Sequence, residues 1–194
     1  MLEIDYSKYY WKNDLIQLRQ PKADDWETLI PNMYDSIARF FFNDEIEMPV
    51  DIDAYKQWLV DSLKPGASPY ISLTIENSVG KHVGIANIFG IDERNGRFGP
   101  IGIQINPMDR KKGYGIATCR MLGKYMFNEL RMHKWNSGYL EENKASEALH
   151  RKLGFKIEGV QIDMCFHEGR YWNEVICGMT EMQFFDNEKL LSVI

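Results

Sequence analysis

Hydrophobic positions recur with a helical period in the first third of the chain. Apolar residues return every three or four positions between residues 26 and 41 and again between residues 54 and 63, which is typical of amphipathic helices, and a polar, acidic connection separates the two stretches. We predict one helical stretch after Asp24 and Asp25, whose carboxylates can cap it, and a second helix over Ala54–Leu63. Pro31 is expected to disturb the first stretch or to begin another helix. A strand over Leu15–Arg19 precedes these helices.

From residue 70 onward the apolar and polar positions alternate, which indicates strands. Strands are predicted over Tyr70–Ile75, Val83–Ile91 and Phe98–Ile105. Turns at Asn77–Lys81 and Asp92–Gly96 join them, and the second turn carries the strong hairpin pair Asn-Gly. Because both connections are too short for a crossover, the three strands should form an antiparallel meander.

The remaining sequence mixes both periods. A helix is predicted over Gly115–Leu130, a strand over Lys134–Leu140, and a short helix that is capped by Asn143 and ends at Gly154. A hairpin of residues 155–166 and 171–179 follows. This order of elements predicts an α+β fold with a central, mostly antiparallel mixed sheet that is flanked by helices.

Composition narrows the class of protein. The 194 residues are 44% hydrophobic and 26% charged, which is typical of a soluble protein with one domain over residues 1–194. The net charge of -5 argues against a nucleic-acid partner, and no apolar run is long enough to span a membrane. The start of the sequence has no apolar signal region, and three cysteines (Cys119, Cys165 and Cys177) form no close pair. We therefore expect a cytoplasmic protein.

The segment RKKGYG at residues 110–115 places three cations and two glycines between a predicted strand and a predicted helix. The first N–H groups of a helix lack internal partners and carry the positive end of its dipole. Together with the cations they can bind a phosphate. A basic surface turn is the alternative interpretation, since the segment matches neither the GxxxxGK[ST] motif nor the three-glycine dinucleotide motif.

RKKGYG resembles the [Q/R]xxGx[G/A] signature of the GNAT superfamily of N-acetyltransferases. A second block, ENKASEALHRKLGF at residues 142–155, resembles the family's other recurrent stretch, and the order of elements agrees from about Arg19 to about Met182. With GRYWNE at residues 169–174, the blocks are most similar to the branch of ribosomal-protein N-terminal acetyltransferases and spermidine acetyltransferases. Homodimers are common in that branch, so we also consider a homodimer.

The resemblance implies the GNAT fold, acetyl-CoA as co-substrate and direct transfer of its acetyl group to a primary amine, without a metal. The acceptor is then a protein N-terminus or a small amine such as a polyamine. The residues implied to bind the cofactor are Ile103, Gln104, Ile105, Arg110, Lys111, Lys112, Gly113, Tyr114, Gly115, Ile116, Ala117, Asn143 and Ser146. In the family, the first of these lie on a splayed strand, and an Asn at position 143 contacts the pantetheine arm.

The sequence departs from the family pattern at the proton donor. The family's usual donor to the CoA thiolate is a tyrosine four residues before the Gly of Gly-Phe, and His150 stands there in this chain. His150 either replaces the tyrosine as an acid or leaves this step to water. This departure keeps an alternative open, namely an acyl-CoA-binding domain with weak or lost transferase activity.

The base that removes the amine proton is left open by the sequence. Glu142 matches a Glu of the branch and is the named candidate; Glu141, Glu76, Asp92, Glu93 and a chain of waters are alternatives. We expect the acidic residues Asp44, Glu45 and Glu47 to attract a cationic amine. His167-Glu168 lacks the second His of the HExxH zinc motif, and the four histidines show no metal-ligand spacing.

Overall fold

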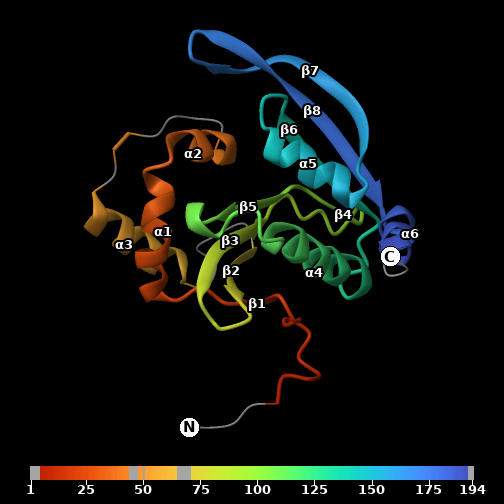
Figure 1. Cartoon of the computed structure of the whole chain (residues 1–194). Coiled ribbons are helices and arrows are strands. Elements are labelled where there is room, and N and C mark those ends of the chain that lie inside the picture. The colour runs from red at the N-terminus through yellow and green to blue at the C-terminus, as the bar shows by residue number, and fades with distance from the viewer. Residues whose placement is uncertain (1–4, 44–47, 50, 65–70, 192–194) are drawn as a thin grey trace.

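The computed structural model describes residues 5–43, 48–49, 51–64 and 71–191, and these form two four-stranded sheets with flanking helices (Figure 1). In chain order the elements are β1 (Ile16–Arg19), α1 (Trp26–Met33), α2 (Ser36–Asn43), α3 (Ile52–Ser62), β2 (Ile71–Asn77), β3 (His82–Ile88), β4 (Arg97–Phe98), β5 (Ile101–Ile105), α4 (Tyr114–Asn128), β6 (Lys134–Leu140), α5 (Lys144–Leu153), β7 (Lys156–His167), β8 (Arg170–Thr180) and α6 (Glu181–Leu191). The prediction of a mostly antiparallel α+β fold is confirmed.

The strands divide between two sheets at a point that the sequence pattern did not indicate. The first sheet has the order β1-β2-β3-β5 and is antiparallel throughout, which confirms the predicted meander. The second has the order β4-β6-β8-β7, with β4 parallel to β6. The predicted strand Phe98–Ile105 is therefore two strands. The break at Gly99 and Pro100 is held by Phe89, whose carbonyl accepts from the Gly99 N–H at 2.9 Å.

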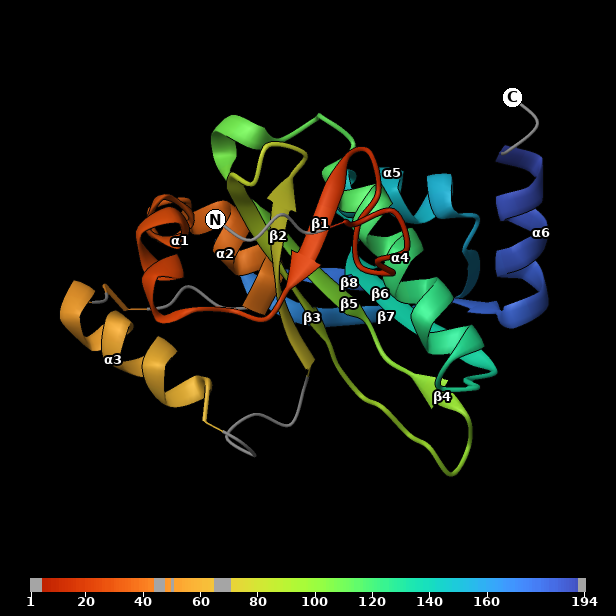
Figure 2. The same cartoon turned by 90° about the horizontal axis from the view of Figure 1, so that it is seen from below.

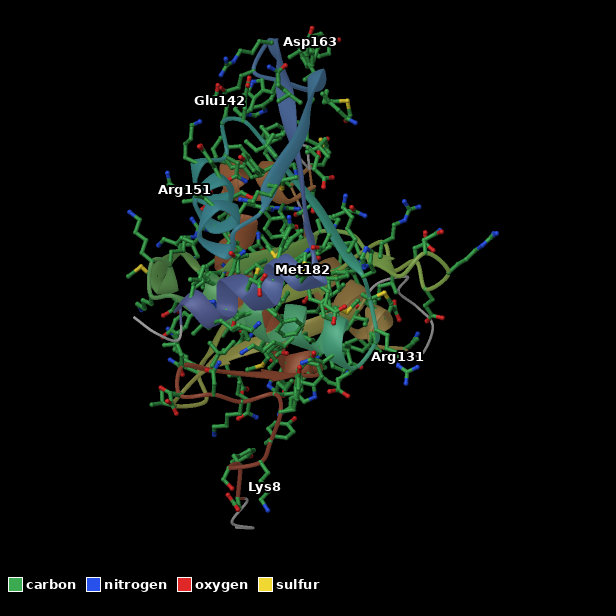
Figure 3. The ribbon with its side chains drawn as sticks, turned by 90° about the vertical axis from the view of Figure 1, so that its right-hand side faces the viewer. Lys8, Arg131, Glu142, Arg151, Asp163 and Met182 are labelled. Atoms are coloured by element: carbon green, nitrogen blue, oxygen red, sulfur yellow. The ribbon has the colours of Figure 1, made fainter. Side chains whose placement is uncertain are left out.

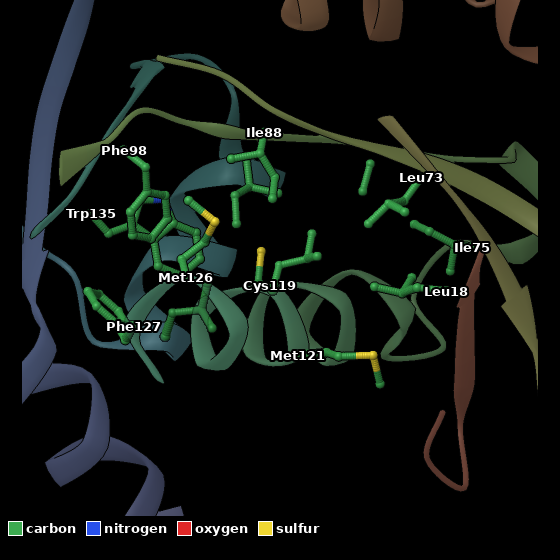
Figure 4. Packing of buried hydrophobic residues seen from close by; sticks show 14 of the residues in the cluster. Leu18, Leu73, Ile75, Ile88, Phe98, Cys119, Met121, Met126, Phe127 and Trp135 are labelled. Carbon is green, nitrogen blue, oxygen red and sulfur yellow. The ribbon is translucent and has the colours of Figure 1, made fainter. Parts of the chain in front are cut away.

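Helix α4 fixes the main core. Apolar side chains of the first sheet, including Leu18, Ile75 and Ile88, share one buried cluster with Cys119 and Met126 of this helix (Figure 4). Helices α1 and α2 lie on the other side of the first sheet (Figures 1 and 2). Because α4 is held along its length by burial, its first turn has a fixed position beside β5.

Helix α6 was not predicted. Phe184 on this helix is buried against α4, where a Cβ on Gly123 would lie 2.7 Å from the Phe184 ring. The sequence does carry a start signal, since Thr180 and Gln183 exchange two hydrogen bonds between side chain and backbone. This reciprocal pair is a capping box, and the pattern TEMQ could have revealed the helix.

Asp25 does not cap α1 as predicted. Its carboxylate instead accepts from Arg19 at 2.7 Å and from the Thr74 hydroxyl at 2.7 Å, and no side-chain bond to the first turn of α1 is present. The charge of Arg19 outweighs what a helix cap offers at this buried position. Pro31 lies inside α1 rather than at a helix start, and the break between α1 and α2 consists of Tyr34 and Asp35, directly after Met33.

The β7–β8 hairpin extends past the rest of the described chain (Figures 1 and 3). Asp163, in an irregular stretch of β7, lies at the opposite end of the molecule from Lys8 in Figure 3. The base of this hairpin pairs with β6, so that Leu140 at the end of β6 stands opposite Glu174 of β8. This register places Glu174 of the hairpin next to the end of β6.

Candidate active site

A cavity of about 560 Å³ opens where the two sheets diverge. Strand β5 is the last strand of the first sheet, and β6 belongs to the second, so no ladder joins them. Residues of β5 and β6 line the cavity, together with the start of α4, one side of α5 and the end of α2. A smaller space of about 340 Å³ between α2 and β5 shares several of these residues. The free edge of β5 therefore exposes backbone groups to the cavity.

The loop before α4 has the geometry of an anion-binding turn. Lys111 and Gly113 adopt left-handed backbone conformations with φ of 62° and 86°, which turn the chain sharply into the helix at Tyr114. Gly113 has no side-chain cap to offer the first N–H groups of the helix. A Cβ on Gly115 would meet no atom within 4 Å, so a ligand can approach the backbone there. The geometry suits a phosphate at this helix start.

The three cations of this loop differ in their partners. The Arg110 guanidinium lies 2.8 Å from Asp35 and also donates to the carbonyl of Ile105 at 3.0 Å. Lys112 pairs with Asp109 at 2.9 Å, which raises the pKa of Lys112, and it does not line the cavity. Arg110 and Lys111 do line the cavity. These two cations, and not Lys112, are placed to meet a bound anion.

The other predicted cofactor residues divide in the same way. Those that line the cavity are Ile103, Ile105, Gly113, Gly115, Ile116, Asn143 and Ser146. Gln104 lines the smaller adjoining space. Tyr114 is buried in the core, and Ala117 packs against the core, so neither side chain reaches the cavity. Only the backbone of Tyr114, in the first turn of α4, is placed to contribute there.

Helix α5 begins and ends as predicted. The Asn143 side chain accepts from the backbone N–H of Ser146 at 3.0 Å, and Gly154 ends the helix in a left-handed conformation. His150 lines the cavity, with Nδ1 at 2.8 Å from the Ser146 carbonyl and Nε2 at 2.8 Å from Ser137 Oγ. Burial of the ring lowers the pKa of His150.

The sequence did not indicate any of the four residues of β6 that line the cavity, Ser137, Gly138, Tyr139 and Leu140. Ser137 and Tyr139 lie on the same face of β6 as the buried Trp135, because side chains alternate along a strand. The ring of Tyr139 lies 5.0 Å from that of His150, and burial raises the pKa of Tyr139. The alternation of side chains along the predicted strand could be seen in the sequence. That this face of β6 packs against α5 could not be seen there.

The acidic candidates do not gather at the cavity. Glu142 pairs with Arg170 at 3.1 Å, and Figure 3 shows it at the periphery of the molecule. Glu141 accepts from Asn173, Glu76 pairs with Arg19, and Asp92 pairs with Arg97. None of these residues, nor Glu93, lines the cavity. The hydrogen bonds and ion pairs of Glu142, Glu141, Glu76 and Asp92 favour structural roles for these residues, because they join neighbouring strands and turns.

Glu174 is the one carboxylate among the described residues that line the main cavity. In the sequence Glu174 stands at the end of GRYWNE, and no separate role was predicted for it. A Cβ on Gly138 would lie 2.7 Å from Glu174 Oε1, so the absence of a side chain at Gly138 leaves room for this carboxylate across β6. The acidic residues Asp44, Glu45 and Glu47 lie outside the described residues.

Aromatic rings line the side of the cavity that α2 covers. Phe41 and Phe42 reach it from α2, and Phe89 reaches it from the segment after β3. A Cβ on Gly102 would lie 3.1 Å from the rings of both Phe42 and Phe89, so the glycine permits this close approach. This part of the cavity is apolar, apart from Glu174.

Other chemistries find less support. In the described part of the chain, no group of three or more His, Cys, Asp or Glu is placed to hold a metal ion. Burial raises the pKa of the Cys119 and Cys177 thiols to about 12, so neither provides a thiolate near neutral pH. None of the described helices has the length and apolar character needed to cross a membrane.

Comparison with known proteins agrees with this geometry. An uncharacterized N-acetyltransferase from the SPbeta prophage of Bacillus subtilis (strain 168) is 28% identical over 175 residues, or 90% of this chain and 95% of the relative. The spermidine N(1)-acetyltransferase of Escherichia coli (strain K12) is 23% identical over 155 residues, or 79% of each. The crystal structure of Vibrio cholerae spermidine N-acetyltransferase with CoA and spermine gives a TM-score of 0.74 at 19% identity, over 89% of this chain and 99% of that one.

The sequence profile of the acetyltransferase (GNAT) domain matches residues 16–156, which is more than half of the chain. This match contains the diverging strands, the anion-binding turn and all of α5. The chain therefore belongs to the GNAT family and is an N-acetyltransferase.

Proposed function

We propose that the chain transfers the acetyl group of acetyl-CoA to a primary amine of a small polycation of the polyamine class. The observation that carries this proposal is one cavity lined both by the anion-binding start of α4 and by the Glu174 carboxylate. Two relatives support the acceptor class: one is a spermidine N(1)-acetyltransferase, and another was solved with CoA and spermine.

Acetyl-CoA fits the residues of the cavity. The N–H groups of residues 113–116, with Arg110 and Lys111, would hold its pyrophosphate over the open position at Gly115. The free edge of β5, facing Asn143 and Ser146, would hold the pantetheine arm. When bound, acetyl-CoA supplies the activated thioester carbonyl. The chain's part is to fix that carbonyl beside the amine, which removes much of the entropic barrier to their reaction.

Glu174 acts on the amine. A free alkyl ammonium group has a pKa of about 10.4 and must lose a proton before its nitrogen can attack. The Glu174 carboxylate attracts the cation into a cavity in which it is the one carboxylate among the described lining residues, and it accepts that proton directly or through water. Backbone N–H groups on the free edge of β5 stabilise the negative charge that forms on the carbonyl oxygen.

An acceptor screen tests the proposed function. The protein is incubated with acetyl-CoA and separately with spermidine, spermine, an aminoglycoside and N-terminal peptides, and each product is read by mass spectrometry. We expect one added acetyl group on a polyamine, with release of CoA. Acetylation of the peptides alone would favour the protein N-terminus as acceptor. Thermal stabilisation by acetyl-CoA without CoA release on any amine would favour the alternative of an acyl-CoA-binding domain.

A further inference from the structure

The hydrogen bonds of His150 fix which of its ring nitrogens carries the proton. Nδ1 lies 2.8 Å from the carbonyl oxygen of Ser146, which can only accept. The Ser146 hydroxyl oxygen lies farther from Nδ1, at 3.2 Å, and a hydroxyl can accept as well as donate. The shorter contact with the carbonyl assigns the proton to Nδ1, and in a neutral imidazole Nε2 is then an acceptor. The atom 2.8 Å from Nε2 is Ser137 Oγ, so the Ser137 hydroxyl donates its proton to His150.

The surroundings keep this ring neutral. Burial disfavours the imidazolium, and this is the main reason why the pKa of His150 is lowered. Its closest ring neighbours are Tyr139 on β6 and Phe155 after α5, neither of which carries charge at pH 7. The titratable groups that line the same cavity are Arg110, Lys111, Tyr139, Lys152 and Glu174. A neutral ring with Nδ1 protonated has no proton to donate from Nε2.

The sequence left two alternatives for His150, a replacement acid or a step that relies on water, and this arrangement makes the ring a proton acceptor first. A neutral His150 with its proton on Nδ1 has only a lone pair at Nε2, and that lone pair accepts from the Ser137 hydroxyl. Ser137 and His150 both line the cavity. A serine hydroxyl can accept one proton while it gives up another, so it can connect the ring to atoms that His150 does not touch.

We propose that Ser137 is a further catalytic residue, which passes protons between the reacting atoms and Nε2 of His150. This inference rests on the proposed acetyl transfer. His150 is first the acceptor of a proton and then its source, and the carbonyl of Ser146 holds the ring in the orientation that both steps need.

The proton balance closes within one turnover. After the neutral amine attacks the carbonyl, the new C–N bond leaves a positive nitrogen. Its proton moves to Ser137 Oγ, while the hydroxyl proton of Ser137 moves to Nε2 of His150. When the C–S bond breaks, the sulfur takes a proton from the Ser137 hydroxyl, and the oxygen recovers one from Nε2. The products are the amide and the CoA thiol, and both side chains return to their starting states.

Substitutions test the relay. We expect Ser137→Ala to lower kcat for polyamine acetylation about a hundredfold, with the KM for acetyl-CoA within about threefold of the parent value. Ser137→Thr keeps a hydroxyl and should recover most of the rate. The control is Ser78→Ala, in the exposed turn after β2. Because both residues act in one path, Ser137→Ala combined with His150→Gln should cost no more than the larger single effect.

Nitrogen-15 NMR of the free protein gives a second readout that does not depend on turnover. At pH 7.5 we expect His150 Nδ1 to be protonated and Nε2 unprotonated, and Ser137→Ala to shift the Nε2 resonance. Protonated Nε2, additive losses in the double variant, or a kcat for Ser137→Ala within twofold of the parent would each overturn the relay and leave the proposed function standing. If the parent protein acetylates no amine in the screen, the proposed function fails and the relay fails with it.

Discussion

The Arg110 guanidinium lies 2.8 Å from the Asp35 carboxylate, which ties the anion-binding turn to the start of α2. Asp35 also accepts from the backbone N–H of Ala38 at 3.0 Å, so one carboxylate both caps α2 and holds the cation. Although its partial burial acts in the opposite direction, these two hydrogen bonds lower the pKa of Asp35. A phosphate that binds Arg110 must compete with Asp35 for the guanidinium.

Removing that competition should tighten acetyl-CoA binding. Asp35→Asn keeps the oxygen that caps α2 but loses the charge, and we expect the Kd for acetyl-CoA to fall about two- to fivefold, the scale of a partly exposed ion pair. Isothermal titration calorimetry measures this change. Asp92→Asn is a matched control, because Asp92 pairs with Arg97 and accepts from Asn95 away from the cavity. A weaker or unchanged Kd for Asp35→Asn would contradict the competition.

Two glycines of α4 should separate binding from stability. Gly115→Ala adds a methyl group where a Cβ meets no protein atom, so it should raise the free energy of unfolding by up to about 1 kcal/mol and weaken acetyl-CoA binding at least tenfold. Gly123→Ala places its Cβ 2.7 Å from the Phe184 ring and should lower that free energy by about 1–3 kcal/mol. Urea unfolding and calorimetry measure both. Unchanged binding in folded Gly115→Ala would remove the pyrophosphate assignment.

Much of the fold follows from local signals in the sequence. Asn143 and Gly154 mark the ends of α5 because a side-chain cap and a left-handed glycine act within one helical turn. The split of Phe98–Ile105 into two strands was missed because the choice of strand partner is made by residues far away in the sequence. Helix α6 was not predicted, although Thr180 and Gln183 form a capping box at its start. The single domain over residues 1–194, the cytoplasmic location and the homodimer stay predictions.

The site was harder to predict than the fold. The anion-binding turn is continuous in sequence, so its residues could be named. Ser137 and Glu174 reach the cavity only because β6 pairs with β8 in one register and α5 covers one face of β6. Glu142 is adjacent to the cavity residue Asn143, yet the turn after β6 directs its carboxylate to Arg170. Adjacency in sequence was a poor guide at this turn.

Glu174→Gln should separate the two substrates. Loss of the carboxylate removes the attraction for a cation and a proton acceptor from the cavity, so we expect kcat/KM for a polyamine to fall about a hundredfold. The Kd for acetyl-CoA should stay within about twofold. Glu93→Gln, in an exposed turn, is the control. Steady-state kinetics with varied acceptor measure the effect; an unchanged kcat/KM would transfer the role of base to water or to another group.

Stability should fall as the pH drops below neutrality. His82 is buried, and burial lowers its pKa; the nearby charge of Arg19 lowers the pKa as well. Asp25, whose carboxylate lies 3.6 Å from the ring, and Glu76 raise the pKa, but they do not offset burial. The unfolded chain therefore binds the proton more tightly, with a pKa of about 6.5. The contribution of His82 to the free energy of unfolding should decrease from about pH 6.5 down to its lower folded pKa, by at most about 1.4 kcal/mol per pH unit.

Substitutions of single histidines show which groups cause the loss of stability at low pH. His150 has a pKa lowered by burial in the same direction, so His82→Gln and His150→Gln should each make the loss of stability between pH 7 and pH 5 less steep. The exposed His133 provides the control His133→Gln, which should leave the slope unchanged. Urea unfolding at a series of pH values measures the slopes. A slope that neither variant changes would mean that other groups titrate in this range.

The division of one chain segment between two sheets, at Gly99 and Pro100, has a consequence for how this protein can change. The opening between β5 and β6 is made by main-chain topology, so it does not depend on any single lining side chain. Point substitutions at Phe41 or Phe89 would then alter which amine enters while the opening itself persists. A fold of this kind can change its acceptor specificity by single substitutions, and no intermediate sequence has to lose the folded state.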